Sequence, residues 1–83
     1  MQDIVLAEWQ KGNGNIIRFK VYELDGHLRL DLREYFPVGD EWKPTRKGIN
    51  LPARAANEIS KSAKRAARLI EKRATKKRYL RKS

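Results

Sequence analysis

The pair Asp25-Gly26 constrains this chain most, because it lies between two segments that alternate apolar and polar residues. Asp-Gly is a preferred pair for the two-residue type I′ turn that joins antiparallel strands. The segment before it, 16–23, alternates Ile17, Phe19 and Val21 with polar residues, and the segment after it, 27–36, alternates leucines with charged residues. The sequence therefore predicts a β-hairpin with one apolar face.

The rest of the chain extends this hairpin into a small α+β domain. Asn13-Gly14 predicts a second two-residue turn, between strands at 4–10 and 16–23. After a loop at 37–41, residues 42–51 predict a fourth strand, irregular at Pro44, which cannot donate to a ladder. From Pro52 onward, apolar residues recur at helical spacing. We therefore expect a curved four-stranded antiparallel sheet followed by one C-terminal helix over 1–74, with a frayed or disordered basic tail at 75–83.

The two turns set the registers of the strands. The turn at 25–26 pairs Arg18 with Arg33, and the turn at 13–14 places Trp9 opposite Arg18. One face then combines cations with aromatic rings: Trp9, Arg18, Lys20, Tyr22, Arg29, Arg33 and Tyr35. The two facing arginines are expected to repel each other unless an anion lies between them. Such a face suits the phosphates and flat bases of single-stranded nucleic acid, although a solvated sheet face commonly carries the same residue types.

The positive charge is concentrated at the C-terminal end. Residues 1–60 contain equal numbers of cations and acids, whereas residues 61–83 contain eleven lysines and arginines and a single acid, Glu71. The whole net charge of +10 therefore lies in this quarter of the chain. Such a block attracts polyanions, which predicts RNA or duplex DNA as further partners of the basic tail. The other interpretation is a solvated helix end that keeps the protein soluble.

The expected helix has a narrow, alanine-rich apolar stripe. Its members are Ile59, Ala63, Ala67 and Ile70. An 83-residue domain buries only about 60% of its unfolded surface, so a second copy that completes the core is expected. The stripe therefore predicts a homodimer interface.

Several classes of function are disfavoured. The chain has no cysteine and no apolar run long enough to span a membrane, and its N-terminus lacks the pattern of a signal peptide. We expect a cytoplasmic protein, associated with the nucleoid in a bacterium, or a nuclear protein in a eukaryote. The single histidine, His27, lies beside a turn, and the acids do not converge. The sequence predicts no enzyme, no cofactor and no metal site.

Two stretches carry a resemblance to a known family. LDLREYF at 30–36 and KPTRKGINL at 43–51, followed by a helix, resemble the positive cofactor four (p-fifteen transcriptional coactivator) family over residues 16–72. The resemblance implies four antiparallel strands and one helix, a homodimer, and single-stranded DNA bound across the strands. The family's DNA-contacting positions match Arg33, Phe36, Lys43 and Lys47, and Arg46 matches the motif.

The chain also departs from the family pattern. Phe36 stands where the family usually has tryptophan, Thr45 stands where glycine is common, and Leu24 replaces an aromatic before the second turn. The serine-rich arm of the eukaryotic coactivator is absent and the basic tail is extra, which indicates a compact bacterial or phage-type member.

The prediction for function is sequence-tolerant binding of single-stranded DNA, in transcription, replication or repair. No expected helix carries side chains suited to reading a major groove. Two alternatives remain open. One is an RNA-binding protein, since nothing here reads the 2′-hydroxyl. The other is a protein-interaction coactivator module that docks on the transcription machinery through its helix.

Overall fold

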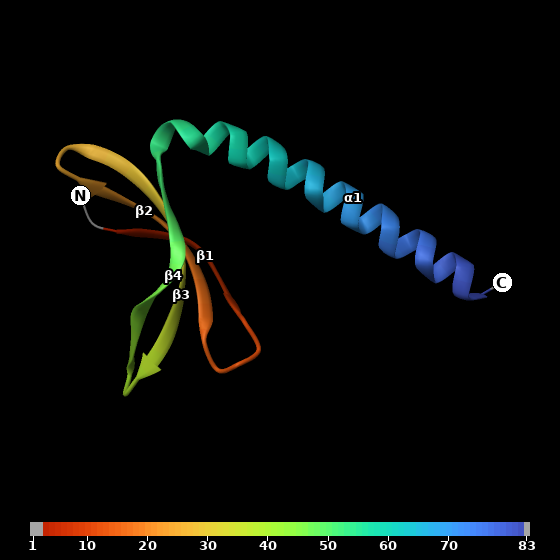
Figure 1. Cartoon of the computed structure of the whole chain (residues 1–83), viewed down its shortest axis with the longest axis horizontal. Helices are drawn as coiled ribbons and strands as arrows, with labels where there is room; N and C mark the ends of the chain where they lie inside the picture. The colour runs from red at the N-terminus through yellow and green to blue at the C-terminus, as the bar shows by residue number, and fades with distance from the viewer. Residues whose placement is uncertain (1–2, 83) are drawn as a thin grey trace.

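The computed structural model describes the backbone of residues 3–82 and the side chains of residues 3–74. Four strands form one antiparallel sheet in sequence order, and a single long helix follows (Figure 1). The elements are β1 (Ile4–Gln10), β2 (Ile16–Leu24), β3 (His27–Val38), β4 (Glu41–Pro52), a short 3₁₀ turn η1 (Ala53–Ala55) and α1 (Ala56–Lys82). This confirms the predicted sheet and C-terminal helix. The helical backbone continues to Lys82, so the prediction of a frayed or disordered tail is wrong for residues 75–82.

The hairpin between β2 and β3 has the predicted turn and register. Asp25 and Gly26 both have positive φ, 51° and 78°, as a type I′ turn requires. The pairing runs without a shift from Leu24 opposite His27 to Ile16 opposite Tyr35. Arg18 therefore lies opposite Arg33, as predicted.

The hairpin between β1 and β2 differs from the prediction by one residue. The last ladder pair is Gln10 with Ile16, and the loop is closed by the Lys11 N–H, which donates to the Asn15 carbonyl at 3.0 Å. Trp9 consequently pairs with Ile17, and Glu8 pairs with Arg18. A slip of one residue moves each side chain to the other face of a sheet. The prediction that Trp9 lies beside Arg18 is therefore wrong, because Glu8 occupies that place.

A buried carboxylate on β3 explains the longer loop. Glu34 is only 3% exposed. Its oxygens accept hydrogen bonds from Lys11 Nζ at 2.6 Å, Asn15 Nδ2 at 2.6 Å and Asn13 Nδ2 at 3.3 Å. A buried charge must be paired to be tolerated, so these three contacts hold the loop against the sheet. They fix the loop over 11–15 in place of the two-residue turn.

The ladder between β3 and β4 is interrupted by a bulge beside Pro44. Arg33 pairs with Gly48 but Tyr35 pairs with Pro44, so residues 45–47 of β4 lie against a single residue of β3. The Thr45 hydroxyl stabilises this bulge, because it donates to the Glu34 carbonyl at 2.9 Å and accepts from the Lys47 N–H at 3.1 Å. The predicted irregularity of the fourth strand is confirmed.

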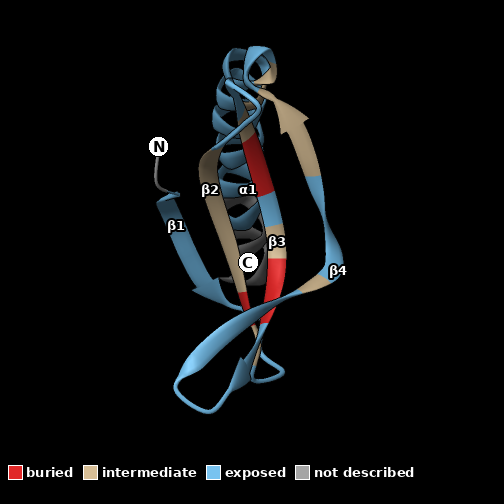
Figure 2. Ribbon diagram, turned by 90° about the vertical axis from the view of Figure 1, so that its left-hand side faces the viewer, coloured by how far each residue is buried: buried red, intermediate tan, exposed pale blue. Residues whose placement is uncertain are grey.

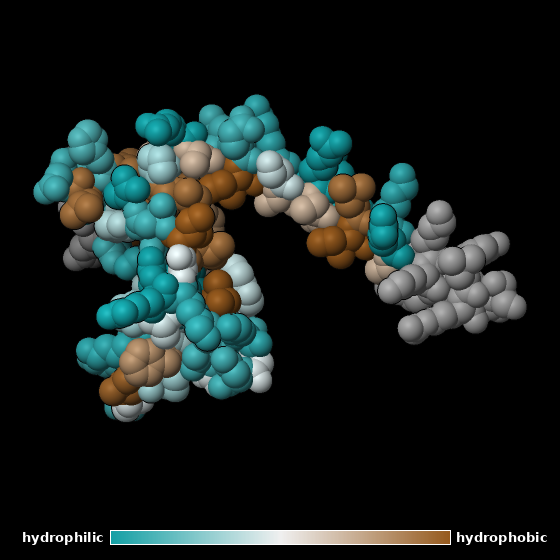
Figure 3. All heavy atoms as spheres, in the orientation of Figure 1, coloured by the Kyte–Doolittle hydropathy of each residue, from teal (hydrophilic) through white to brown (hydrophobic). Residues whose placement is uncertain are grey.

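One side of the sheet is apolar and open. This apolar face consists of Ala7, Trp9, Ile17, Phe19, Val21, Leu28, Leu30, Leu32, Ile49 and Leu51. Trp9 is 49% exposed and Ile49 is 51% exposed, and burial is confined to parts of β2 and β3 (Figure 2). Helix α1 leaves the sheet after β4 and runs away from it (Figure 1). Hydrophobic atoms gather on the side of the sheet that faces α1 and on the underside of the helix (Figure 3).

The ion cluster at Glu34 predicts a pH dependence of stability. The Lys11 ammonium, followed by the Asn15 amide, holds the pKa of Glu34 at about 2, below its ordinary 4.5. A carboxyl whose pKa is lowered in the folded state stabilises that state at neutral pH, and this contribution is lost as pH falls from about 4.5 toward 2. Glu34→Gln should therefore be less stable than the wild type at pH 6, with a difference that shrinks toward pH 2.

Urea unfolding midpoints measured across this pH range check the prediction. The control is Glu41→Gln, which changes an exposed carboxylate at the tip of the β3–β4 hairpin and should keep the wild-type slope. A Glu34→Gln curve parallel to that of the wild type would contradict the role given to this carboxylate.

Candidate nucleic-acid interface

The side of the sheet opposite the apolar face gathers most of the predicted binding residues. We call it the polar face; its members on β2 and β3 are Arg18, Lys20, Tyr22, Arg29, Asp31, Arg33 and Tyr35, joined by Glu8 of β1 and Asn50 of β4. All six binding residues predicted on β2 and before Phe36 on β3 lie here. Trp9 does not.

The centre of the polar face is the carboxylate of Asp31, which is 4% exposed. It accepts hydrogen bonds from Arg33 Nε and Nη2, both at 3.0 Å, and from Asn50 Nδ2 at 3.2 Å. Burial alone would raise the pKa of Asp31, but the hydrogen bonds from Arg33 and Asn50 lower it. The carboxylate therefore stays ionised and holds strands β3 and β4 together.

Arg33 also reaches across to the bulge. Its Nη1 donates to the Thr45 carbonyl at 3.0 Å. The residue opposite Arg33 is Gly48, where a Cβ would meet Arg33 Cβ and Cγ at 2.8 Å. Glycine at this position therefore gives the arginine side chain the room to lie over β4.

The facing arginines do not form the expected repulsive pair. Arg18 Nε donates to Glu8 at 2.5 Å, and the Arg18 guanidinium lies 4.4 Å from the centre of the Tyr35 ring. Arg33 has its own carboxylate, Asp31. The expectation of uncompensated repulsion is wrong, because the register of β1 brings Glu8 next to Arg18.

The tyrosine rings of the polar face form cation–π contacts with Arg18 and Lys20, which leaves little ring surface exposed for stacking. Tyr35 is only 4% exposed, because Arg18 covers it and Lys20 Nζ lies 6.0 Å from its centre. Lys20 Nζ also lies 5.5 Å from the Tyr22 ring and donates to Asp3 at 2.8 Å. Tyr22 accepts a hydrogen bond from Asn50 Nδ2 at 2.5 Å. Tyr22 is half-buried and Tyr35 is covered, so this burial does not favour the stacking role predicted for Tyr35.

The remaining predicted residues lie around the bulge and the projecting end of the β3–β4 hairpin. Phe36, which is 38% exposed, pairs with Lys43. Its side chain lies on the face opposite that of Tyr35, and it lies beyond Ile16, the first residue of β2. Lys43 lies 3.4 Å from Glu41. Arg46 and Lys47 belong to the bulge, are exposed, and form no ion pair with any residue that the structure describes. They are the cations most available to a phosphate.

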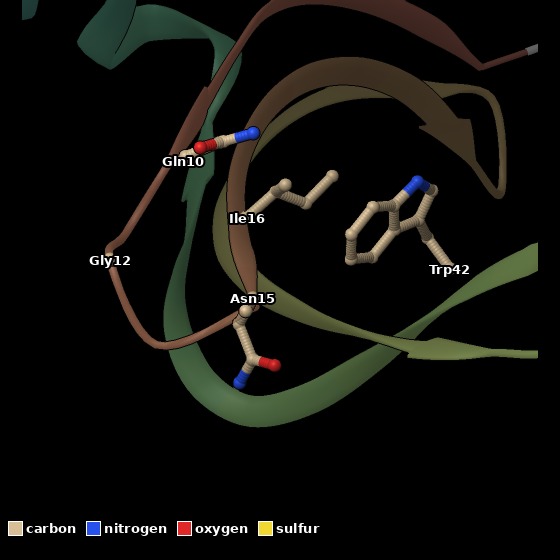
Figure 4. Close-up of a pocket in the computed structure, with 6 residues that line it drawn as sticks. Gln10, Gly12, Asn15, Ile16 and Trp42 are labelled. Atoms are coloured by element: carbon tan, nitrogen blue, oxygen red, sulfur yellow. The ribbon is translucent and has the colours of Figure 1, made fainter.

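Sequence reasoning missed Trp42, which is 38% exposed and faces Ile16 across a hollow of about 210 Å³ (Figure 4). A second hollow, of about 270 Å³, lies farther along the polar face between Lys20, Tyr22 and Pro44. The alternation of a strand could have indicated Trp42, because it lies two residues before Pro44, which pairs with Tyr35.

The described part of the chain shows no sign of a metal centre or of a membrane segment. Among the described side chains, those of residues 3–74, no three histidine, cysteine or acidic groups lie close enough together to hold an ion. No helix in the described part is long and apolar enough to cross a bilayer.

Comparison with known proteins agrees with this architecture. The family model described as Transcriptional Coactivator p15 (PC4) matches residues 9–62. A PC4 homolog from Burkholderia pseudomallei, solved in two crystal forms, has TM-scores of 0.65 and 0.68 and identities of 22% and 24%. These alignments cover 80% and 81% of this chain and 98% and 92% of theirs.

A third solved structure is of phage origin. The bacteriophage T5 homolog of the eukaryotic transcription coactivator PC4, described as implicated in recombination-dependent DNA replication, has a TM-score of 0.58 and 25% identity. Its alignment covers 92% of this chain and 96% of that chain. No curated protein sequence matches the chain.

The contacts of Arg18 reverse the expected effect of removing it. Arg18→Thr would remove the ion pair with Glu8 and the contact with Tyr35, instead of relieving repulsion. We expect it to lower the free energy of unfolding by about 0.5–1.5 kcal/mol, the sum of an exposed ion pair and a cation–π contact.

Urea unfolding of Arg18→Thr, Glu8→Gln and the double variant tests this in a cycle. The double variant should cost less than the sum of the two single variants, because both remove the same ion pair. A gain of stability in Arg18→Thr would instead support uncompensated repulsion from Arg33.

Proposed function

The chain belongs to the PC4 family, and we propose that it binds single-stranded DNA with little sequence discrimination. The family consists of non-enzymatic DNA-binding proteins, so the prediction that the chain is not an enzyme is confirmed. Membership of the family is associated with binding of single-stranded DNA. Transcription, replication and repair are the processes in which we expect such binding to be used.

The observation that carries the proposal is that the two bulge cations, Arg46 and Lys47, are exposed and form no ion pair with any residue that the structure describes. Arg46 and Lys47 project from the bulge, next to the point where Arg33 donates to the Thr45 carbonyl. On the polar face itself, most cations already have carboxylate partners: Glu8, Asp3 and Asp31. We therefore assign the main phosphate contacts to Arg46 and Lys47. Lys43, whose ion pair with Glu41 is exposed, adds a third contact, and its pairing partner Phe36 offers an exposed ring.

Binding with little sequence discrimination is expected because polar groups of the polar face already form hydrogen bonds with one another. Asn50 is shared between Arg29, Tyr22 and Asp31, and Asp31 is occupied by Arg33. The Asn50 amide and the Asp31 carboxylate are therefore already engaged within the protein. Binding by charge and stacking alone is sequence-tolerant, because each base has a flat face and each nucleotide a phosphate.

A second copy of the chain completes the proposed binding unit. Trp9 and Ile49 on the apolar face are about half exposed, and Leu69 and Ile70 on α1 are 57% and 69% exposed. Exposed apolar patches of this kind are unusual on a monomer. We propose a homodimer in which these two surfaces are covered by the second copy, with Ile59, Ala63, Ala67 and Ile70 in the interface. Of the described α1 side chains only Ile59 is half-buried within one copy.

Helix α1 supplies the second candidate, binding of RNA or duplex DNA. From Lys61 to Arg73 its described side chains include six cations and one acid, Glu71, on a helix that projects from the sheet (Figure 1). Such a helix attracts any polyanion without reading it. A protein-interaction role for α1 is the third alternative, and it differs from both because it requires no binding of nucleic acid.

The first test compares nucleic acids and two charge-matched variants. The wild type should bind labelled single strands more tightly than duplex of equal length, with a log–log salt slope of about −0.7 per phosphate contact. Arg46→Gln with Lys47→Gln should weaken binding to single strands and make that slope shallower by about 1.4. Fluorescence anisotropy titrations at several salt concentrations measure both quantities.

The control removes the same charge from α1, in Lys61→Gln with Lys64→Gln. If the bulge binds phosphates, this variant should keep most of its affinity for single strands. Equal losses in the two variants would indicate attraction by net charge alone, and equal affinity for duplex would contradict the proposed function.

The second test concerns the dimer. Ile70→Lys places a charge in the apolar stripe, so it should lower the midpoint of thermal unfolding and raise the fraction of monomer. For the wild type, the midpoint should rise with protein concentration, because association stabilises only the folded state. Asn57→Lys adds the same charge on the opposite side of α1 and should leave the dimer intact. A folded wild-type monomer at micromolar concentration, measured by light scattering, would contradict the proposal.

A further inference from the structure

The hollow between Trp42 and Ile16 is not explained by the phosphate contacts at the bulge. Three parts of the chain build it: the end of β1 at Gln10, the loop with Gly12, Gly14 and Asn15, and the β3–β4 hairpin with Trp42. Ile16, which is 8% exposed, forms its floor, and the indole of Trp42 stands across from it (Figure 4).

The loop side of this hollow is open and held in place. Gly12 and Gly14 have positive φ, and a Cβ at either position would meet nothing within 4 Å. The loop cannot easily collapse into the hollow, because Lys11 and Asn15 are bound to the buried Glu34 carboxylate. The space is therefore preformed, and an entering group does not have to order the loop.

The chemistry of the walls fits a flat, partly polar ring. The Trp42 indole and the Ile16 side chain offer apolar surfaces facing each other, and the Gln10 amide stands at the rim (Figure 4). The side-chain amide of Gln10 makes no hydrogen bond with any residue that the structure describes, whereas the Asn15 amide is already bound to Glu34. One amide, with one donor side and one acceptor side, is thus left to meet the edge of a ring.

The hollow also lies on the path expected for a single strand. Ile16 pairs with Tyr35, which in turn pairs with Pro44, two residues from Trp42. The hollow is therefore continuous with the polar face. At about 3.3 Å per residue it lies roughly 13 Å along β2 from Lys20, within reach of a few nucleotides.

We propose that this hollow is a subsite for one unstacked nucleobase of the bound single strand, which packs against Trp42 over Ile16 with its edge at Gln10. The proposal rests on the proposed function, since it requires a single strand along the polar face. The hollow has a volume of about 210 Å³, which admits one ring system and excludes a stacked pair of bases. Because a single amide meets the base edge, the subsite should accept all four bases.

Substitution of Trp42 separates stacking from a simple cover over Ile16. Trp42→Leu keeps an apolar side chain above Ile16 but removes the aromatic face. Base–aromatic stacking contributes enough that its loss should weaken binding to a labelled single strand by about 5- to 100-fold. The salt slope should remain that of the wild type, because no phosphate contact is lost. Trp42→Phe keeps a smaller ring and should lose less affinity.

A spectroscopic readout uses Trp42 itself and does not depend on its substitution. In a Trp9→Phe background, Trp42 is the sole tryptophan. Its fluorescence should be quenched when an oligonucleotide binds, and should change little with an abasic strand of equal length and charge. Gln10→Ala should preserve the quenching with a smaller loss of affinity.

The outcomes distinguish the subsite from the proposed function. If the wild type binds no single strand in anisotropy titrations, the proposed function fails and the subsite fails with it. If the wild type binds but Trp42→Leu binds equally well and Trp42 is not quenched, only the subsite is overturned. Quenching together with a loss of affinity at unchanged salt slope supports it.

Discussion

Two buried carboxylates on one strand organise this molecule. Asp31 and Glu34 lie three residues apart on β3, on opposite sides of the sheet, and are 4% and 3% exposed. A carboxylate at such a position must be met by donors or the fold does not form. Glu34 is met by the loop at 11–15, which fixes the register of β1, and Asp31 is met by Arg33 and Asn50, which tie β4 to β3. Both neighbours of the central hairpin are therefore positioned by charge.

This arrangement reverses the usual distribution of burial within one copy. Tyr35 and Asp31 on the polar face are among the most buried residues, whereas Trp9 and Ile49 on the apolar face are about half exposed. Ion pairs and ring contacts join most of the charged side chains of the polar face to one another. The apolar face and α1 remain open within one copy. In the proposed homodimer the second copy would cover this surface, and the folding of the domain would then be linked to its assembly.

The sequence predicted what depends on local residues. Asp25-Gly26 determined the register between β2 and β3, because a two-residue turn leaves the pairing no freedom. Asn13-Gly14 predicted a two-residue turn that the structure does not have. The length of that loop depends on Glu34, which lies about twenty residues away and binds Lys11 and Asn15. The family resemblance was specific enough to be confirmed, whereas the faces of β1 could not be predicted from a turn motif. The alternation of side chains along a strand could have placed Trp42 on the polar face. The hollow between Trp42 and Ile16 could not be predicted, because it depends on how separate strands are placed in space.

The charge of the bulge depends on a contact made elsewhere. Glu34 lies opposite the three bulge residues of β4, where its carboxylate could neutralise a neighbouring cation. The loop at 11–15 occupies that carboxylate instead, and the Thr45 hydroxyl takes the Glu34 carbonyl. Arg46 and Lys47 are consequently left without an ion pair among the described residues. The N-terminal hairpin therefore does more than add a strand: by satisfying Glu34 it keeps two cations available at the place where the proposed single strand would bind. A shorter, ideal turn at 13–14 would have closed the hairpin and withdrawn that effect.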